Sequence, residues 1–192
     1  SMYDLGNFVL EQALWDSKLF LQQNPDFFIN VNVSAKQLER PDFCRVVLEL
    51  LDKTEFPVRH LCLEITERCR SLPVSVINER MAVLRGYGIK FAMDDFGTGS
   101  SSSAMALEML IDEIKIDMSF IRKILVNKKN KAIVQSMVDF ANAANIKSCL
   151  EGVENKALED YLRTVGATWF QGYYYSKPVG ADELEILLSA KK

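Results

Sequence analysis

The fold is decided by short alternating stretches, of which the clearest is FFINVNV at residues 27–33. Its isoleucine and two valines fall on one face of an extended strand, while Asn30 and Asn32 fall on the other, because side chains alternate along a strand. The same alternation returns in HLCLEI at 60–65 and in DEIKI at 112–116. An apolar face opposite a polar face favours the strands of a closed barrel, which are covered by helices outside and can be polar inside near the top. Strands of an open doubly wound sheet would instead be apolar almost throughout.

Six stretches are predicted as strands, with helical patterns between them. The strands are expected at 27–33, 60–65, 88–94, 112–116, 146–151 and 168–171. A further helix is expected before the first strand, at about 5–22, and a last one from about 181. Strand, helix, strand at this pitch predicts parallel strands with right-handed crossovers. We therefore expect an α/β fold, a TIM-like (β/α)8 barrel, with the missing strands on the N-terminal side.

Composition excludes several classes of protein. The 192 residues are 48% hydrophobic and 26% charged, as in one soluble globular domain. With 23 basic against 26 acidic side chains the net charge is −3, so we expect no binding of duplex nucleic acid and no membrane contact by this segment. There is no long apolar run and no signal-peptide pattern, which favours a cytoplasmic protein. The four cysteines permit two disulfides, but three of them sit in apolar periodic segments, which favours reduced thiols.

A polar side chain stands at the C-terminal end of every predicted strand. In order these are Asn32, Glu64, Asp94 with Asp95, Lys115, Glu151 and Gln171. The carboxyl ends of the strands in a parallel barrel share one rim, where barrel enzymes place their chemistry. Any one of these residues could equally be a helix cap or a turn former. Several carboxylates on one rim repel one another unless cations neutralise them, so the whole set predicts bound divalent cations.

The types of ligand indicate which metal to expect. Carboxylates and a carboxamide, without histidine or thiolate, favour Mg²⁺ or Mn²⁺, with Ca²⁺ as an inhibitory substitute. The adjacent Asp94 and Asp95 suggest a ligand shared by two ions, and a two-metal site suits the hydrolysis of a phosphoester. Lys115 would either orient the attacking water or act as a counter-ion to the aspartates, and chemistry alone leaves both roles open. The glycines and serines at 96–103 predict a surface loop, either a plain connection or a lid.

Six short motifs then occur in one order along the chain. They are Asn32-Val33-Ser34, Leu63-Glu64-Ile65-Thr66-Glu67, Asp94-Asp95-Phe96-Gly97-Thr98-Gly99, Lys115-Ile116-Asp117, Glu151-Gly152-Val153-Glu154 and Gln171-Gly172-Tyr173. Together they resemble the EAL-domain cyclic-di-GMP phosphodiesterases, and the likeness runs through nearly the whole chain. The resemblance implies a modified (β/α)8 barrel, usually a homodimer, that cuts cyclic di-GMP to linear pGpG with two Mg²⁺ or Mn²⁺ ions.

The resemblance also implies roles for individual residues. The matches to metal ligands are Asn32, Glu64, Asp94, Asp95 and Glu151. Lys115 matches the residue that activates the water, and Glu151 is also a match for the base. Glu67 matches a residue that anchors the loop after the aspartates. Glu154 and Gln171 match further residues of the site rim.

The chain also departs from the family pattern. The signature Glu-Ala-Leu segment, whose glutamate is a metal ligand, would lie upstream of Ser1 and is not in this sequence. Residues 1–192 are therefore expected to be an N-terminally incomplete EAL-like domain, lacking its first strand, from a longer multidomain signalling protein. Ser100 and Ser103 replace an aromatic residue and a leucine of the family, and Leu150 replaces an alanine. The implied function is a phosphodiesterase, and the alternative is an inactive EAL-like domain that senses cyclic di-GMP or binds another protein.

Overall fold

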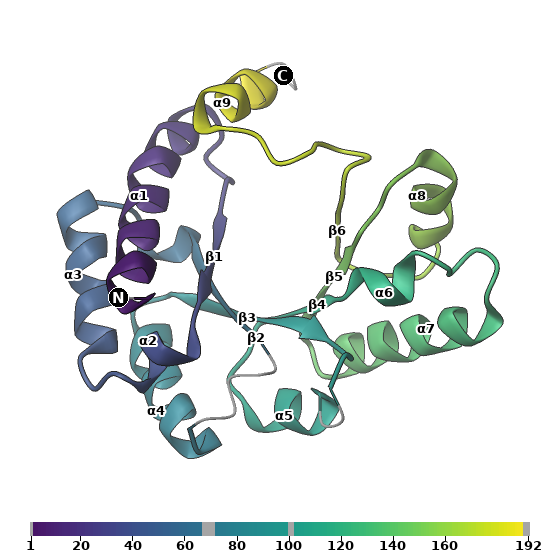
Figure 1. The fold of residues 1–192 in the computed structure, drawn as a ribbon, viewed down its shortest axis with the longest axis horizontal. Coiled ribbons are helices and arrows are strands. Elements are labelled where there is room, and N and C mark those ends of the chain that lie inside the picture. Colours follow the sequence, from purple (N-terminus) through teal and green to yellow (C-terminus); the bar gives the residue numbers. More distant parts are fainter. Residues whose placement is uncertain (1, 67–71, 100–101, 190–192) are drawn as a thin grey trace. The chain divides into compact units, whose positions relative to one another are not determined.

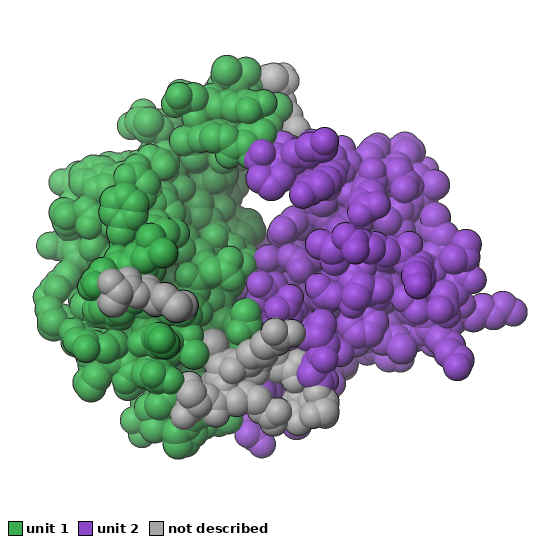
Figure 2. All heavy atoms as spheres, viewed as in Figure 1, with its two compact units in different colours: residues 1–91, 179–192 green, residues 92–178 purple. Residues whose placement is uncertain are grey.

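The computed structural model describes residues 2–66, 72–99 and 102–189. Contacts divide the chain into two compact units, coloured separately in Figure 2. Unit 1 comprises residues 1–91 and 179–192, and unit 2 comprises residues 92–178.

Unit 1 contains a long first helix, two paired strands and their connecting helices (Figure 1). Its elements are α1 (Met2–Gln23), β1 (Ile29–Val33), α2 (Ala35–Glu39), α3 (Phe43–Thr54), a 3₁₀ turn (Val58–His60), β2 (Leu61–Thr66), α4 (Val74–Gly86) and α9 (Ala181–Ser189). Strands β1 and β2 are parallel. Helix α1 packs on β1 and α3 through a buried stripe that includes Leu10, Leu14 and Phe20. The alternation predicted for β1 is confirmed, because its three apolar side chains are buried while Asn30 is half-buried and Asn32 exposed.

Unit 2 contains most of β3 (Lys90–Phe96), which begins in unit 1, and three further strands. Its other elements are α5 (Ser102–Glu108), β4 (Glu113–Ile116), α6 (Met118–Ile121), α7 (Lys128–Ala143), β5 (Lys147–Glu151), α8 (Lys156–Leu162) and β6 (Trp169–Gln171). Each of β3, β4 and β5 pairs in parallel with the next strand. Helix α7 packs on β4 and β5 and buries Val134, Val138 and Ala141. Figure 1 shows α7 running alongside these strands.

The predicted elements are confirmed. All six strands lie within one or two residues of their expected positions, and α9 begins at residue 181 as expected. Helix α1 ends one residue beyond its expected end and begins three residues before its expected start. The strand order is that of the chain, from β1 to β6 without reversal. A doubly wound sheet would reverse its order at a switch point, whereas a TIM-like fold keeps the chain order.

The cysteines of the described ranges are free thiols. Cys62 and Cys149 are buried and Cys44 is half-buried, whereas Cys69 lies outside the described residues. In the part of the chain that the structure describes, no helix is long and apolar enough to cross a bilayer.

Candidate active site

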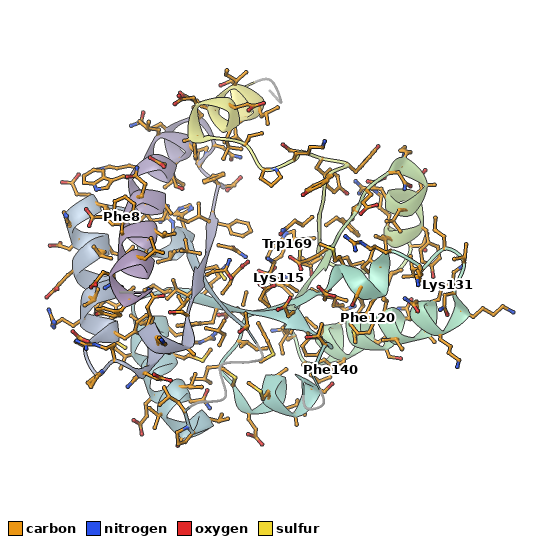
Figure 3. The ribbon with its side chains drawn as sticks, viewed as in Figure 1. Phe8, Lys115, Phe120, Lys131, Phe140 and Trp169 are labelled. Carbon is orange, nitrogen blue, oxygen red and sulfur yellow. The ribbon has the colours of Figure 1, made fainter. Side chains whose placement is uncertain are left out.

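Lys115 is a buried lysine on an inner strand of unit 2, with only 5% of its surface exposed. Its Nζ lies 2.9 Å from Glu151 Oε1 and 3.8 Å from Asp94 Oδ1. These carboxylates come from the strands on either side, because β4 pairs with both β3 and β5. Burying an ammonium group is costly unless anions accompany it, and the two carboxylates offset that cost. Figure 3 shows Lys115 among the strand side chains, whereas Lys131 of the same unit lies out on α7.

Asp94 and Asp95 occupy a β-bulge in β3. The register shifts between Met93 and Phe96, so that two aspartates stand opposite the single residue Lys115. Asp95 has a φ of 55°, in the left-handed region, and its N–H donates to Asp94 Oδ1 at 3.0 Å. Aspartate enters this region more readily than most residues. In an unbroken strand adjacent side chains point to opposite faces, and the bulge releases the second aspartate from that alternation.

Glu151 ends β5 and pairs in register with Gln171, which ends β6. After Glu151 the chain turns at Gly152, whose φ is 79° and where a Cβ would lie 2.5 Å from a side-chain atom of α6. A Cβ on Gly172 would lie 2.2 Å from the carbonyl oxygen of Val153. The N–H of Val153 donates to the Gln171 carbonyl at 3.0 Å. Glycine is therefore required where the ends of the two strands approach each other. The Gln171 side chain at the end of β6 is exposed.

Glu154 lies outside the buried group of unit 2. Its side chain is 53% exposed and pairs with Arg122 at 3.7 Å. Arg122 was not predicted from the sequence, because it stands in the turn after α6 and no motif marks it.

In unit 1, Asn32 and Glu64 form a cross-strand pair, because β1 and β2 pair in register there. Glu64 is only 4% exposed. Asn30 lies two residues before Asn32 on the same polar face, and its Nδ2 donates to Glu64 Oε1 at 2.8 Å. The alternation of β1 predicts Asn30 on this face but gives it no partner, so the contact with Glu64 appears only in the structure.

The structure thus gathers the predicted residues within each unit. Asn32 and Glu64 stand in register on neighbouring strands of unit 1, while Lys115 lies close to Asp94 and Glu151 in unit 2. Asp95 and Gln171 adjoin that second group. Glu67, the predicted loop anchor, lies outside the described residues.

The donor chemistry of both groups fits a hard divalent cation. Every candidate ligand offers a carboxylate or carboxamide oxygen, the ligand type that Mg²⁺ and Mn²⁺ prefer. In unit 1 the buried Oδ1 of Asn30 has no hydrogen-bond partner, so an oxygen acceptor remains available beside Glu64. Within residues 2–66, 72–99 and 102–189, no three His, Cys, Asp or Glu side chains form a group that could hold a metal ion. The fit to a hard cation therefore rests on the type of ligand atom and on pairs of neighbouring side chains within each unit.

The comparison with known families decides the classification, because the EAL domain profile matches residues 2–178. The chain belongs to the EAL domain family. Among its relatives, the cyclic di-GMP phosphodiesterase PdeA of Borreliella burgdorferi is 31% identical over 175 residues, which cover 91% of this chain and 26% of the relative. The chain spans about a quarter of the length of the curated relatives it matches.

Solved EAL domains confirm the fold. The PaMucR phosphodiesterase in complex with c-di-GMP has a TM-score of 0.89 at 30% identity, over 95% of this chain and 74% of that one. BlrP1 of Klebsiella pneumoniae, solved as a manganese/cy-diGMP complex, has a TM-score of 0.82 at 25% identity, over 92% of this chain and 45% of that one. The predicted family and the TIM-like α/β fold are both correct, and the described part of this EAL domain has six strands.

Proposed function

We propose that this EAL domain is a metal-dependent phosphodiesterase that hydrolyses cyclic di-GMP to linear pGpG. The observation that carries the proposal is Lys115, buried 2.9 Å from Glu151 and 3.8 Å from Asp94. A buried cation flanked by carboxylates at the ends of parallel strands is an arrangement suited to chemistry on a phosphoester. The names of PdeA and PaMucR support the same substrate and reaction.

Two Mg²⁺ or Mn²⁺ ions are the proposed cofactors, with Ca²⁺ as an inhibitory substitute. The residues that would hold the ions are Asn32, Glu64, Asp94, Asp95 and Glu151. When bound, such ions neutralise charge on the phosphodiester and lower the pKa of a coordinated water. The manganese complex of BlrP1 supports this choice of metal.

Lys115 is the proposed residue that orients the attacking water. An ammonium group carries three N–H donors. The ammonium group lies 2.9 Å from Glu151, and N–H donors of this kind can orient a water molecule or a phosphoryl oxygen beside that carboxylate. Glu151 is the proposed base, since its carboxylate can accept the proton that the water releases.

The remaining site residues have proposed roles at the edge of the site. Gln171, exposed at the end of β6, and Glu154, exposed beside Arg122, would contact the dinucleotide. Glu67 would anchor the loop after the aspartates. We also propose that the chain forms a homodimer and that it is located in the cytoplasm.

The test is the Mn²⁺-dependent hydrolysis of cyclic di-GMP, with the products separated by chromatography. We expect linear pGpG to form, and to disappear when a chelator is added. Lys115→Met should still bind cyclic di-GMP while its turnover falls by about two to four orders of magnitude. Lys147→Met, a change of an exposed lysine at the start of β5, should keep full turnover.

Two results would contradict the proposal in different ways. If cyclic di-GMP binds but no product forms, the chain is the inactive sensor rather than the enzyme. If cyclic di-GMP does not bind at all, the substrate assignment is wrong.

A further inference from the structure

Asn30 stands two residues before the proposed metal ligand Asn32 on β1 of unit 1. It pairs in register with Cys62, and Glu64 follows two residues later on the same face of β2. The Asn30 amide reaches diagonally to Glu64 and donates from Nδ2 to Oε1 at 2.8 Å. A diagonal neighbour on a parallel pair is within reach of such a side chain, so the backbone register itself sets up this contact.

The orientation of the Asn30 amide follows from this bond. If the amide were turned over, its carbonyl oxygen would face the Glu64 carboxylate, and two acceptors would repel each other. The N–H must therefore point at Glu64. Since Glu64 is only 4% exposed, water contributes little to holding its carboxylate in place, and the Asn30 donor limits the rotation of that side chain.

The other end of the same amide is left without a partner. The Asn30 Oδ1 is buried, and in the described part of the chain no group donates a hydrogen bond to it. Native proteins rarely leave a buried acceptor unsatisfied, so such an atom calls for an explanation, such as an ion or a bound water. An oxygen acceptor beside a buried carboxylate is suited to receive a water that a hard cation carries with it.

We propose that Asn30 is a positioning residue for the divalent-cation site, acting through Glu64. Its N–H fixes the Glu64 carboxylate, and its carbonyl accepts a hydrogen bond once a hydrated cation is present. This inference rests on the proposed function, because it takes Glu64 to be a metal ligand. It adds a residue that none of the six motifs assigns a role.

The experiment measures Mn²⁺ binding by calorimetry, without nucleotide, together with the melting temperature. Asn30→Leu keeps the side chain nearly the same size but removes both the donor and the acceptor. We expect Mn²⁺ affinity to fall roughly 10- to 100-fold, because that is the usual effect of removing a residue that orients a metal ligand. The melting temperature without metal should stay close to that of the unaltered chain, because loss of the bond to Glu64 is offset by removal of the unsatisfied Asn30 Oδ1.

Asn30→Ser is the second variant, since its short hydroxyl cannot span the same distance to Glu64, and it should weaken Mn²⁺ binding in the same direction. The control is Asn142→Leu, a change of an exposed asparagine on α7 whose side-chain amide donates to the Gly166 carbonyl at 3.3 Å. That control should bind Mn²⁺ as the unaltered chain does.

Three outcomes would overturn the inference. Unchanged Mn²⁺ affinity in both Asn30 variants would remove the positioning role and leave the proposed function standing. A lower melting temperature with unchanged Mn²⁺ affinity would show a purely structural role. If the unaltered chain fails to bind Mn²⁺, the metal assignment of the proposed function fails, and the inference fails with it.

Discussion

Replacing Lys115 by methionine is expected to destabilise the protein at neutral pH. Methionine has a similar length and shape, so the change removes the charge with little loss of packing. It leaves the carboxylates of Glu151 and Asp94, whose side chains are 15% and 18% exposed, without the cation that lies between their strands.

The size of the effect follows from this burial. Removing one partner of a buried ion pair costs about 3–5 kcal/mol. Since both carboxylates keep some exposure and can recover part of their hydration, we expect the lower end, about 3 kcal/mol. In a protein of this length 1 kcal/mol shifts the melting temperature by about 2–4 °C, so Lys115→Met should melt roughly 6–12 °C lower.

The assay is thermal and urea unfolding of Lys115→Met beside Lys147→Met. Lys147 is exposed and its substitution should change the free energy of unfolding by less than about 0.5 kcal/mol. Mn²⁺ should restore part of the stability lost in Lys115→Met, because a bound cation would again neutralise the carboxylates. If Lys115→Met melts at the same temperature as the unaltered chain, the buried ion pair does not contribute as argued.

Three further predictions concern other parts of the chain. Gly172→Ala should lower the free energy of unfolding by about 1–3 kcal/mol, because the added Cβ would lie 2.2 Å from a backbone oxygen. In the control Gly180→Ala the added Cβ has no neighbour within 4 Å, so the urea midpoint should not change. Arg163→Met should lower the urea midpoint, because it removes a cation that pairs with Glu159, which is only 4% exposed; an unchanged midpoint would contradict this. Burial raises the pKa of the Cys44 thiol, so a smaller fraction of it is thiolate at pH 8 than in free cysteine. Alkylation of Cys44, monitored by mass spectrometry of the peptide that contains it, should therefore be slower than alkylation of free cysteine. An equal rate would show that the thiol is not shielded.

Much of the fold could be predicted because burial imposes a period on the sequence. The alternation of isoleucine and valine with asparagine in β1 reports one covered face, and the structure buries those apolar side chains. The pairing of Asn32 with Glu64 was accessible for a related reason, because residues at the carboxyl ends of neighbouring parallel strands meet at one edge.

The missing details depend on geometry that spacing does not encode. Nothing in two adjacent aspartates reveals that Asp95 takes a positive φ in a bulge, since an unbroken strand would carry the same letters. The bond from Asn30 to Glu64 needs the register of two strands and a side-chain rotamer. Arg122 meets Glu154 through a turn and a loop, which have no period to read.

The extra residue in β3 also limits how this chain can change. Deleting either Asp94 or Asp95 would restore the two-residue repeat and leave a single aspartate opposite Lys115, while Phe96 would keep its place opposite Ile116. Phe96 is buried and its ring centroid lies 6.2 Å from that of Phe140, so a strand that kept both aspartates without the bulge would turn this side chain out of its hydrophobic packing. Anyone transplanting the paired aspartates into another parallel scaffold must therefore carry over the kinked backbone as well as the two acidic residues.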